Sequence, residues 1–133
     1  MKMLALTLHL YRCVSLRSCY LTSRCCSALC SVLSSSHSRL TELDLSGNNN
    51  MEDSGVDQLC EGLRSENCKL EKLILSDCCL SSRCCSALSL VLLSPNSRLT
   101  ELNMGDKNNN NNIGDSGVAQ LYEISTDVTT RWA

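Results

Sequence analysis

Eleven cysteines and two histidines are the residues of this 133-residue chain whose types could support chemistry. Thiols can form disulfides, bind zinc or act as nucleophiles. The cysteine count is odd, and Cys25 and Cys26 recur as Cys84 and Cys85 at an offset of 59 residues. Because this recurrence follows the architecture of the chain, and a buried free cysteine packs as a small hydrophobic residue, we predict structural free thiols. A secreted disulfide scaffold is the less favoured alternative.

The spacing of these residues does not favour a metal or catalytic centre. A Cys-Cys doublet cannot easily aim both thiolates at one tetrahedral ion, and neither His9 nor His37 completes a zinc-finger ligand set. Catalysis needs one special cysteine, whereas these recur, and His37 is replaced by Asn96 in the next copy. We therefore predict no catalytic residue, no metal ligand, no cofactor, and a chain that is not an enzyme.

The elements that position these residues repeat along the chain. Residues 16–45 and 75–104 share 19 identities in 30 positions. Within each copy a shorter phrase recurs, L-x-x-L-x-L-x-x-N in "LTELDLSGN" and L-x-x-L-x-L-x-x-C-x-L in "LEKLILSDCCL". The phrase begins at residues 11, 40, 70 and 99, so its spacing of 29 or 30 residues is that of leucine-rich repeats. At the Asn or Cys position, we predict that Cys19, Asn48 and Cys78 bond or plug the turn after the strand.

Each phrase is followed by apolar residues spaced as one face of a helix. The four predicted faces are Cys26, Leu29, Cys30 and Leu33; Val56, Leu59, Cys60 and Leu63; Cys85, Leu88 and Leu92; and Val118, Leu121 and Tyr122. Thr22, Asp53, Ser81 and Asp115 precede these faces, where helix N-caps are expected. Each repeat is therefore predicted to be a short strand, a turn and a helix of about three turns.

Stacking such units dictates the shape of the molecule. Parallel strands lie about 4.8 Å apart and packed helices need roughly 8 to 10 Å, so the stack must curve with its strands on the concave face. The predicted fold class is an α/β solenoid, a short curved arc with helices on the convex face. We predict an N-terminal lead-in over residues 1–10, four repeats over residues 11–124, and a C-terminal tail over residues 125–133.

The phrases "LTELDLSGN", "DSGVDQLCEGL" and "CKLEKLILSDCCLSSRCCSALSLVL" resemble the ribonuclease-inhibitor subtype of leucine-rich repeats. That subtype is also found at the C-terminus of NACHT-type NOD-like receptors, and the wording is similar to the large fish sets of such receptors. The resemblance implies a non-enzymatic protein-protein interaction module in an innate immune sensor or regulator. Its partners would be other proteins, or the missing domains of a larger receptor.

The chain also departs from that family. No nucleotide-binding motif G-x-x-x-x-G-K-[ST] appears, and neither end reads as a polar capping repeat. We therefore expect a fragment of a larger receptor. Two alternatives stay open: a stand-alone protein, similar to ribonuclease inhibitor, that occludes a basic enzyme, and a truncated fragment without a function.

The strand residues that lie between the leucines are predicted to form the concave binding surface. These candidate protein-binding residues are Arg12, Thr41, Glu42, Asp44, Glu71, Lys72, Ile74, Thr100, Glu101 and Asn103. We predict that Glu42, Glu71 and Glu101 stack at one position in successive repeats, with Asp44 beside them. Such an acidic stripe would favour a basic partner, although an ordinary solvated strand face would read the same way.

Composition excludes several other classes of function. The formal net charge is −2, so no basic patch for nucleic acid is expected. The longest apolar stretch, residues 3–11, is far shorter than the about 20 residues that span a membrane. With free thiols predicted, we expect a cytoplasmic location. The asparagine run at 108–112 marks a three-residue insertion relative to the preceding copy, and we interpret it as a tolerated surface loop.

Overall fold

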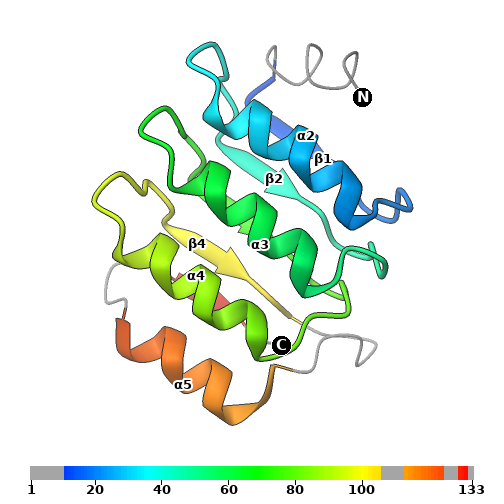
Figure 1. Ribbon diagram of the computed structural model, residues 1–133, viewed down its shortest axis with the longest axis vertical. Helices are drawn as coiled ribbons and strands as arrows, with labels where there is room; N and C mark the ends of the chain where they lie inside the picture. Colours follow the sequence, from blue (N-terminus) through cyan, green and yellow to red (C-terminus); the bar gives the residue numbers. More distant parts are fainter. Residues whose placement is uncertain (1–10, 106–112, 125–128, 132–133) are drawn as a thin grey trace.

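The computed structural model describes residues 11–105, 113–124 and 129–131 of the chain. Strands and helices alternate, as the repeats predict. The elements are β1 (Cys13–Ser15), α2 (Ser23–Ser34), β2 (Glu42–Asp44), α3 (Glu52–Leu63), β3 (Lys72–Ile74), α4 (Arg83–Leu93), β4 (Glu101–Asn103), α5 (Gly114–Ile124) and β5 (Thr129–Arg131). The helices form one layer and the strands form the other, which is the predicted α/β solenoid (Figure 1).

The five strands form one parallel sheet in chain order, β1-β2-β3-β4-β5. Their register aligns the middle residue of each strand, so Val14 pairs with Leu43, Leu43 with Leu73, and Leu73 with Leu102. These are the second leucine positions of the repeated phrase. The phrase therefore sets the register of the sheet as well as the existence of its strands.

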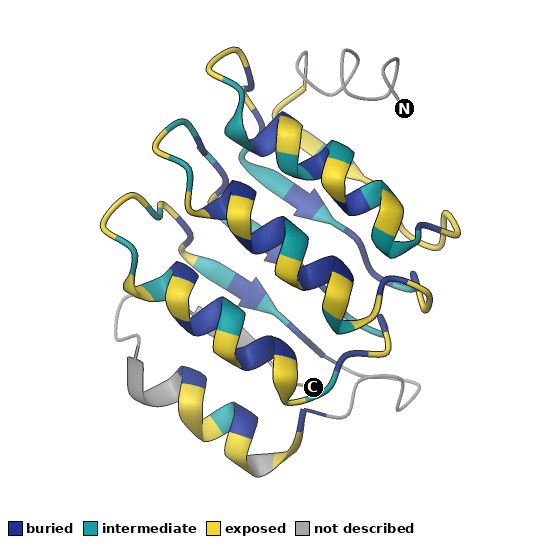
Figure 2. Ribbon diagram, viewed as in Figure 1, coloured by how far each residue is buried: buried dark blue, intermediate teal, exposed yellow. Residues whose placement is uncertain are grey.

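The core lies between the strand layer and the helix layer (Figure 2). Leu43, Leu73 and Leu102 are at most 1% exposed, and the leucines flanking them in the phrase are similarly buried. Of the predicted helical faces, Leu29, Leu59 and Leu88 are at most 1% exposed and belong to the same core. Cys30 and Leu92 are half-buried, and the side chain of Tyr122 lies outside the described part of the chain. Aliphatic side chains and thiols fill this space, since the chain has no phenylalanine.

The fifth strand lies in residues that we predicted as a C-terminal tail. β5 pairs in parallel with β4, placing Thr130 beside Leu102. Its sequence, Thr129–Arg131, contains no leucine and completes no L-x-x-L phrase. The pattern that predicts the other four strands therefore does not predict this one. The lead-in at 1–10 and the asparagine run at 108–112 lie outside the described residues.

The predicted helix N-caps are largely wrong. Thr22 does hold the N-cap of α2, but its side chain makes no capping hydrogen bond. The N-cap of α3 is Met51 and that of α4 is Ser82. Asp53 lies inside the first turn of α3, where its carboxylate accepts hydrogen bonds from the backbone nitrogen and the hydroxyl of Ser81. It therefore ties two repeats together instead of capping its own helix.

Residue 115, the fourth predicted N-cap, also lies within a helix, α5, which begins at Gly114. A cap lies outside the helix that it caps, so this prediction fails in the same way as that for Asp53.

Small residues set the distance between neighbouring helices. A Cβ on Gly55 of α3 would lie 3.0 Å from the Cys26 sulfur of α2, and one on Gly117 of α5 would lie 2.9 Å from the Cys85 sulfur of α4. At Gly62 the obstacle is backbone, because an added Cβ would lie 2.9 Å from the carbonyl oxygen of Cys30. These glycines let the helices approach closely.

Candidate protein-binding face

The strands present two rows of outward-facing residues, defined by the register. The first row contains Cys13, Glu42, Lys72 and Glu101, and the second contains Ser15, Asp44, Ile74 and Asn103. Members of the second row from β2 to β4, like Glu42, Lys72 and Glu101, are half-buried. Both rows lie on the strand layer, so the structure gathers the predicted strand residues on one face.

Arg12, Thr41, Glu71 and Thr100 precede the strands and form a third row beside the first. The Thr41 hydroxyl donates to the Arg12 carbonyl oxygen at 3.2 Å, and the Thr100 hydroxyl donates to that of Glu71 at 3.1 Å. Each threonine therefore forms a hydrogen bond to the preceding repeat while remaining accessible to solvent. We call the three rows together the concave face.

The predicted acidic stripe is wrong, because Glu71 does not stack with Glu42 and Glu101. The residue between those two glutamates is Lys72, which pairs in register with both. Its ammonium lies 3.3 Å from a Glu42 carboxylate oxygen and 3.0 Å from one of Glu101. Hydrogen bonds to Glu101 and Glu42 raise the pKa of Lys72 above its ordinary value, so the row is a bridged acid-base-acid triad.

The predicted stripe fails because Glu71 occupies a different position of the repeated phrase from Glu42 and Glu101. Glu42 and Glu101 directly precede the second leucine of L-x-x-L, whereas Glu71 directly follows the first. Glu71 therefore belongs with Thr41 and Thr100. The signal was present in the sequence, and alignment on Leu43, Leu73 and Leu102 would have shown a lysine between two acids.

Asp44 and Asn103, in the second row, are held by turns that follow their own strands. Asp44 Oδ1 accepts from the Ser46 backbone nitrogen at 3.0 Å and from its hydroxyl at 2.6 Å. Asn103 Oδ1 accepts from the Gly105 nitrogen at 2.9 Å. Arg17 lies over this end of the face, with Nε 3.6 Å from Asp44 Oδ2. Arg17 was not among the predicted site residues, because it follows β1 instead of lying within the strand phrase.

Two hollows open on the concave face. One, of about 330 Å³, surrounds the Lys72 triad and is also lined by Cys13 and Thr100. The other, of about 210 Å³, lies beside Ile74 and reaches Arg17. In both hollows the acidic side chains that line the wall outnumber the basic ones.

The turn after each strand is closed by the predicted Asn or Cys position. Asn48 is 1% exposed, and its amide nitrogen donates to the carbonyl oxygens of Leu16 and Leu45 at 3.0 and 2.7 Å. Its oxygen accepts from the backbone nitrogens of Cys19 and Leu21, each at 3.0 Å. Asn48 thus confirms the prediction by satisfying four backbone groups, three of them in the preceding repeat.

Cysteine fills this position in the neighbouring repeats with different results. Cys78 is fully buried, and its thiol donates to the Leu45 carbonyl oxygen at 3.0 Å, as predicted. Cys19 is exposed, and its thiol contacts the carbonyl oxygen of Arg17 in its own turn at 3.3 Å. Cys19 therefore bonds the turn after its strand, as predicted, but unlike Cys78 it stays exposed and does not fill the turn.

The buried thiols contribute to the core between the strand and helix layers. Six cysteines are buried, namely Cys26, Cys60, Cys68, Cys78, Cys84 and Cys85. Burial raises the pKa of Cys26 and Cys60 to about 12 and that of Cys78 to about 11. A hydrogen bond between Cys84 and Cys85 raises the pKa of Cys84, with burial adding to the effect, and lowers the pKa of Cys85. Cys26, Cys60, Cys78 and Cys84 are thus held in the protonated form, in which a thiol is a poor nucleophile and a poor metal ligand.

Within residues 11–105, 113–124 and 129–131, no group of three or more His, Cys, Asp or Glu side chains is placed to hold a metal ion. Among these same residues, no helix is long and apolar enough to cross a membrane.

Comparison with known proteins identifies the repeats. A family model described as "Leucine Rich repeat" matches residues 37–60 and 66–89. Those two segments contain β2 and β3 with most of the helix that follows each strand. The chain is a leucine-rich-repeat solenoid. A solved structure with the same fold is the leiomodin-1 actin-binding site 2, with a TM-score of 0.73 and 16% identity over 92% of this chain and 70% of that one.

The relatives of this leucine-rich-repeat chain include proteins named for their NACHT, LRR and PYD domains. It is 50% identical over 109 residues to the NACHT, LRR and PYD domains-containing protein 3 of Rattus norvegicus. It is 40% identical over 111 residues to protein 14 of that series in Homo sapiens. Each match covers more than four fifths of this chain, 82% and 84%, but only 10% of the relative, so the chain spans about a tenth of the length of these proteins.

Proposed function

We propose that this leucine-rich-repeat chain is a non-enzymatic module that binds another protein, or other domains of a larger receptor, through its concave face. The observation that carries the proposal is the arrangement of the face itself. Its charged side chains are fixed by neighbours, as Lys72 is by Glu42 and Glu101, so they are ordered before a partner arrives. Preordered polar groups lower the entropic cost of association and favour specific binding.

The similarity to NACHT, LRR and PYD domains-containing proteins supports a place for this module in an innate immune sensor or regulator. The six buried thiols support a reducing compartment such as the cytoplasm, where cysteines stay unpaired. A stand-alone inhibitor of a basic enzyme is less well supported, because Lys72 breaks the acidic stripe that would have recognised such an enzyme.

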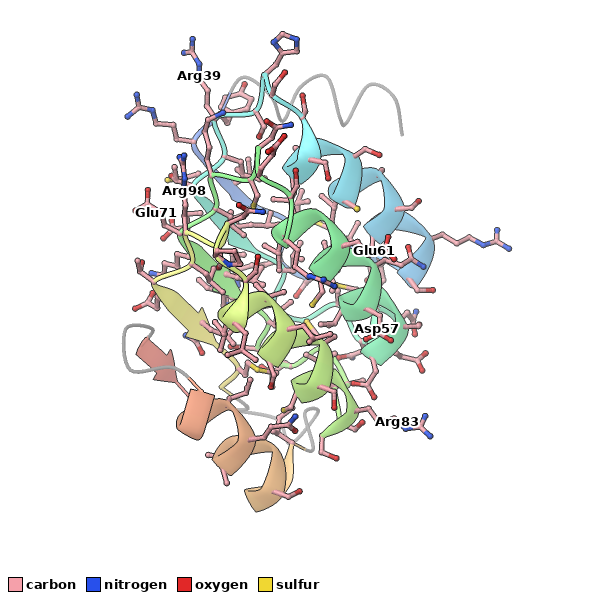
Figure 3. The ribbon with its side chains drawn as sticks, turned by 60° about the vertical axis from the view of Figure 1, so that its left-hand side comes forward. Arg39, Asp57, Glu61, Glu71, Arg83 and Arg98 are labelled. Atoms are coloured by element: carbon pink, nitrogen blue, oxygen red, sulfur yellow. The ribbon has the colours of Figure 1, made fainter. Side chains whose placement is uncertain are left out.

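A pair of charge-reversing variants tests the face directly. Glu42→Lys combined with Glu101→Lys places three lysines in one row, so a partner that docks there should lose at least tenfold in affinity through repulsion. The matched control is Asp57→Lys with Glu61→Lys, which makes the same change of charge on α3. Figure 3 shows Asp57 and Glu61 on the helix side of the molecule and Glu71 on the strand side.

The measurement is capture of partners by the full chain, followed by association kinetics with each captured protein at low and physiological salt. We expect the strand-side pair to lose a captured protein that the helix-side pair retains. Loss with the helix-side pair alone would place the binding surface on the convex side and refute the proposal. Circular dichroism confirms that both variants are folded.

A further inference from the structure

The hollow beside Ile74 combines an apolar floor with polar walls. Ile74 pairs in register with Asp44 on β2 and Asn103 on β4. The corresponding residue of β1 is Ser15, so Ile74 is the one apolar member of this row in β1 to β4. Its half-buried side chain lines the hollow of about 210 Å³ together with Asp44 and Asn103.

Asp44 offers this hollow a carboxylate oxygen that is not fully used. The two hydrogen bonds from Ser46 both fall on Oδ1. An ionised carboxylate can accept about four hydrogen bonds, two on each oxygen. Arg17 Nε lies 3.6 Å from Oδ2, which is too long for a hydrogen bond, and the Arg17 side chain is 67% exposed. The carboxylate can therefore accept a better-placed donor.

Asn103 offers the opposite chemistry on the other side of Ile74. Its oxygen already accepts from the Gly105 nitrogen at 2.9 Å and from the Ser76 hydroxyl at 3.3 Å. Its amide nitrogen donates to no partner among the described residues. Asp44 and Asn103 are two strand spacings apart, which is roughly 10 Å. The hollow thus has an acceptor at one side, an apolar floor, and a donor at the other side.

The charges around the hollow favour a cation. Among the described residues, the charged side chains that line it are two acids, Asp44 and Asp77, and one base, Arg17. A cation bound here also contacts the Ile74 side chain, and a long aliphatic side chain makes that contact better than a compact ion does. Guanidinium is planar, weakly hydrated and able to donate two parallel hydrogen bonds to a carboxylate.

We propose that the hollow beside Ile74 binds one arginine side chain of the partner protein. The guanidinium donates to Asp44 Oδ2, the methylene stem covers Ile74, and the backbone carbonyl of the same arginine accepts from the Asn103 amide. This inference rests on the proposed function, because it names the residue by which a protein on the concave face is recognised. It also assigns Arg17 the role of an internal competitor for Asp44.

The test uses the full chain and a single-residue probe, N-acetyl-arginine methylamide, titrated while the methyl resonances of Ile74 are followed by NMR. The matched control probe is N-acetyl-citrulline methylamide, which keeps the shape of arginine and lacks its charge. Three variants accompany the parent. Asp44→Asn keeps an oxygen for Ser46 and removes the charge, Arg17→Ala removes the competitor, and Arg83→Ala changes an arginine on the helix side (Figure 3).

We expect the arginine probe to shift the Ile74 methyls in a saturable way and to bind at least tenfold more tightly than the citrulline probe. Asp44→Asn should reduce arginine binding to the citrulline level. Arg17→Ala should tighten it about threefold, because a like charge and a competing donor are removed, and Arg83→Ala should leave it unchanged.

Equal binding of the two probes would overturn the proposal. A third probe, N-acetyl-lysine methylamide, carries the same charge on an ammonium group, and tighter binding of it than of the arginine probe would overturn the proposal too. Weaker binding to Arg17→Ala would overturn it too, since Arg17 would then be a ligand and not a competitor. Amide spectra show whether each variant is folded. Because the probe needs no partner protein, its failure refutes the arginine site while the charge-reversal test of the concave face stands.

Discussion

Asn48 shows how a single side chain joins two repeats. Four backbone groups depend on it, from Leu16 and Leu45 as acceptors to Cys19 and Leu21 as donors. A buried backbone group left without a partner costs on the order of 1 to 3 kcal/mol. Cys78 holds the equivalent place one repeat later, where its thiol lies 3.0 Å from the Leu45 carbonyl oxygen and 3.4 Å from that of Ser76. A thiol is a weaker donor and acceptor than an amide, so we expect Cys78 to contribute less to stability than Asn48.

Replacing Asn48 and Cys78 by alanine should therefore have unequal effects. We expect Asn48→Ala to lower the free energy of unfolding by about 3 kcal/mol and Cys78→Ala by about 1 kcal/mol. Urea denaturation monitored by circular dichroism measures both. Equal losses would show that the asparagine amide contributes no more than the thiol.

The buried thiols make stability depend on alkaline pH. Burial raises the pKa of Cys60 from 9.0 to about 12, so in the unfolded chain the thiol ionises near pH 9 while in the folded chain it stays protonated. The unfolded state then binds fewer protons, and the free energy of unfolding falls as the pH rises from 9 toward 12.

Cys60→Ala isolates this contribution. The fall amounts to about 1.4 kcal/mol per pH unit for each such thiol. The variant should lose less stability than the parent between roughly pH 9 and pH 10.5, as measured by urea denaturation at both values. Parallel losses in parent and variant would mean that Cys60 ionises equally in both states.

The helices pack against each other through their smallest residues. Gly62 of α3 approaches the backbone of α2 at Cys30, which cannot move as the end of a flexible side chain can. Alanine favours a helix over glycine by about 1 kcal/mol, but overpacking costs about 1 to 3 kcal/mol. At this position we expect the cost of overpacking to exceed the gain in helix propensity.

Gly62→Ala should accordingly destabilise the chain by about 1 kcal/mol or more, although alanine is the better helix former. Thermal unfolding followed at the helical band measures the change. Ser31→Ala, at an exposed site on α2, is the control and should change stability little. A more stable Gly62→Ala variant would show that α2 and α3 are free to move apart.

Leucine spacing was enough to predict the four strands, the helices after them and the residues of the core. Leu43 and Leu59 belong to patterns with periods of 2 and 3.6 residues, and such patterns survive because burial enforces them. The pairing of Lys72 with Glu42 and Glu101 was missed through an error of register. β5 could not have been found, since Thr129–Arg131 lacks the leucine pattern and is placed by pairing with β4. Asp53 escaped prediction because its partner Ser81 belongs to another repeat.

At the scale of the whole molecule, each repeat is stable only against its neighbours. Leu43 is fully buried between β1 and β3, and its side chain faces the core shared by three repeats. Units of this kind bury no complete core alone, so the array should unfold as one.

Leu43→Asp should therefore unfold the entire array and not a single repeat, because an unpaired charge in this core costs several kcal/mol. Loss of both helical dichroism and amide dispersion at about 25 °C would show this. Ser15→Asp, an exposed strand residue on β1, serves as the control and should remain folded. A Leu43→Asp chain that melts like the parent would contradict the register described above.

The contact between Cys26 and Gly55, repeated between Cys85 and Gly117, determines how such an array can grow or shrink in evolution. Counting from Leu59 and Leu88, the position of Gly55 is held by Cys84 in the next helix. Unequal recombination that removed one repeat would set the Cys26 thiol against another thiol instead of a glycine. Gain or loss of two repeats together preserves the contact. The heritable unit is thus the pair, which is the 59-residue period written in the sequence.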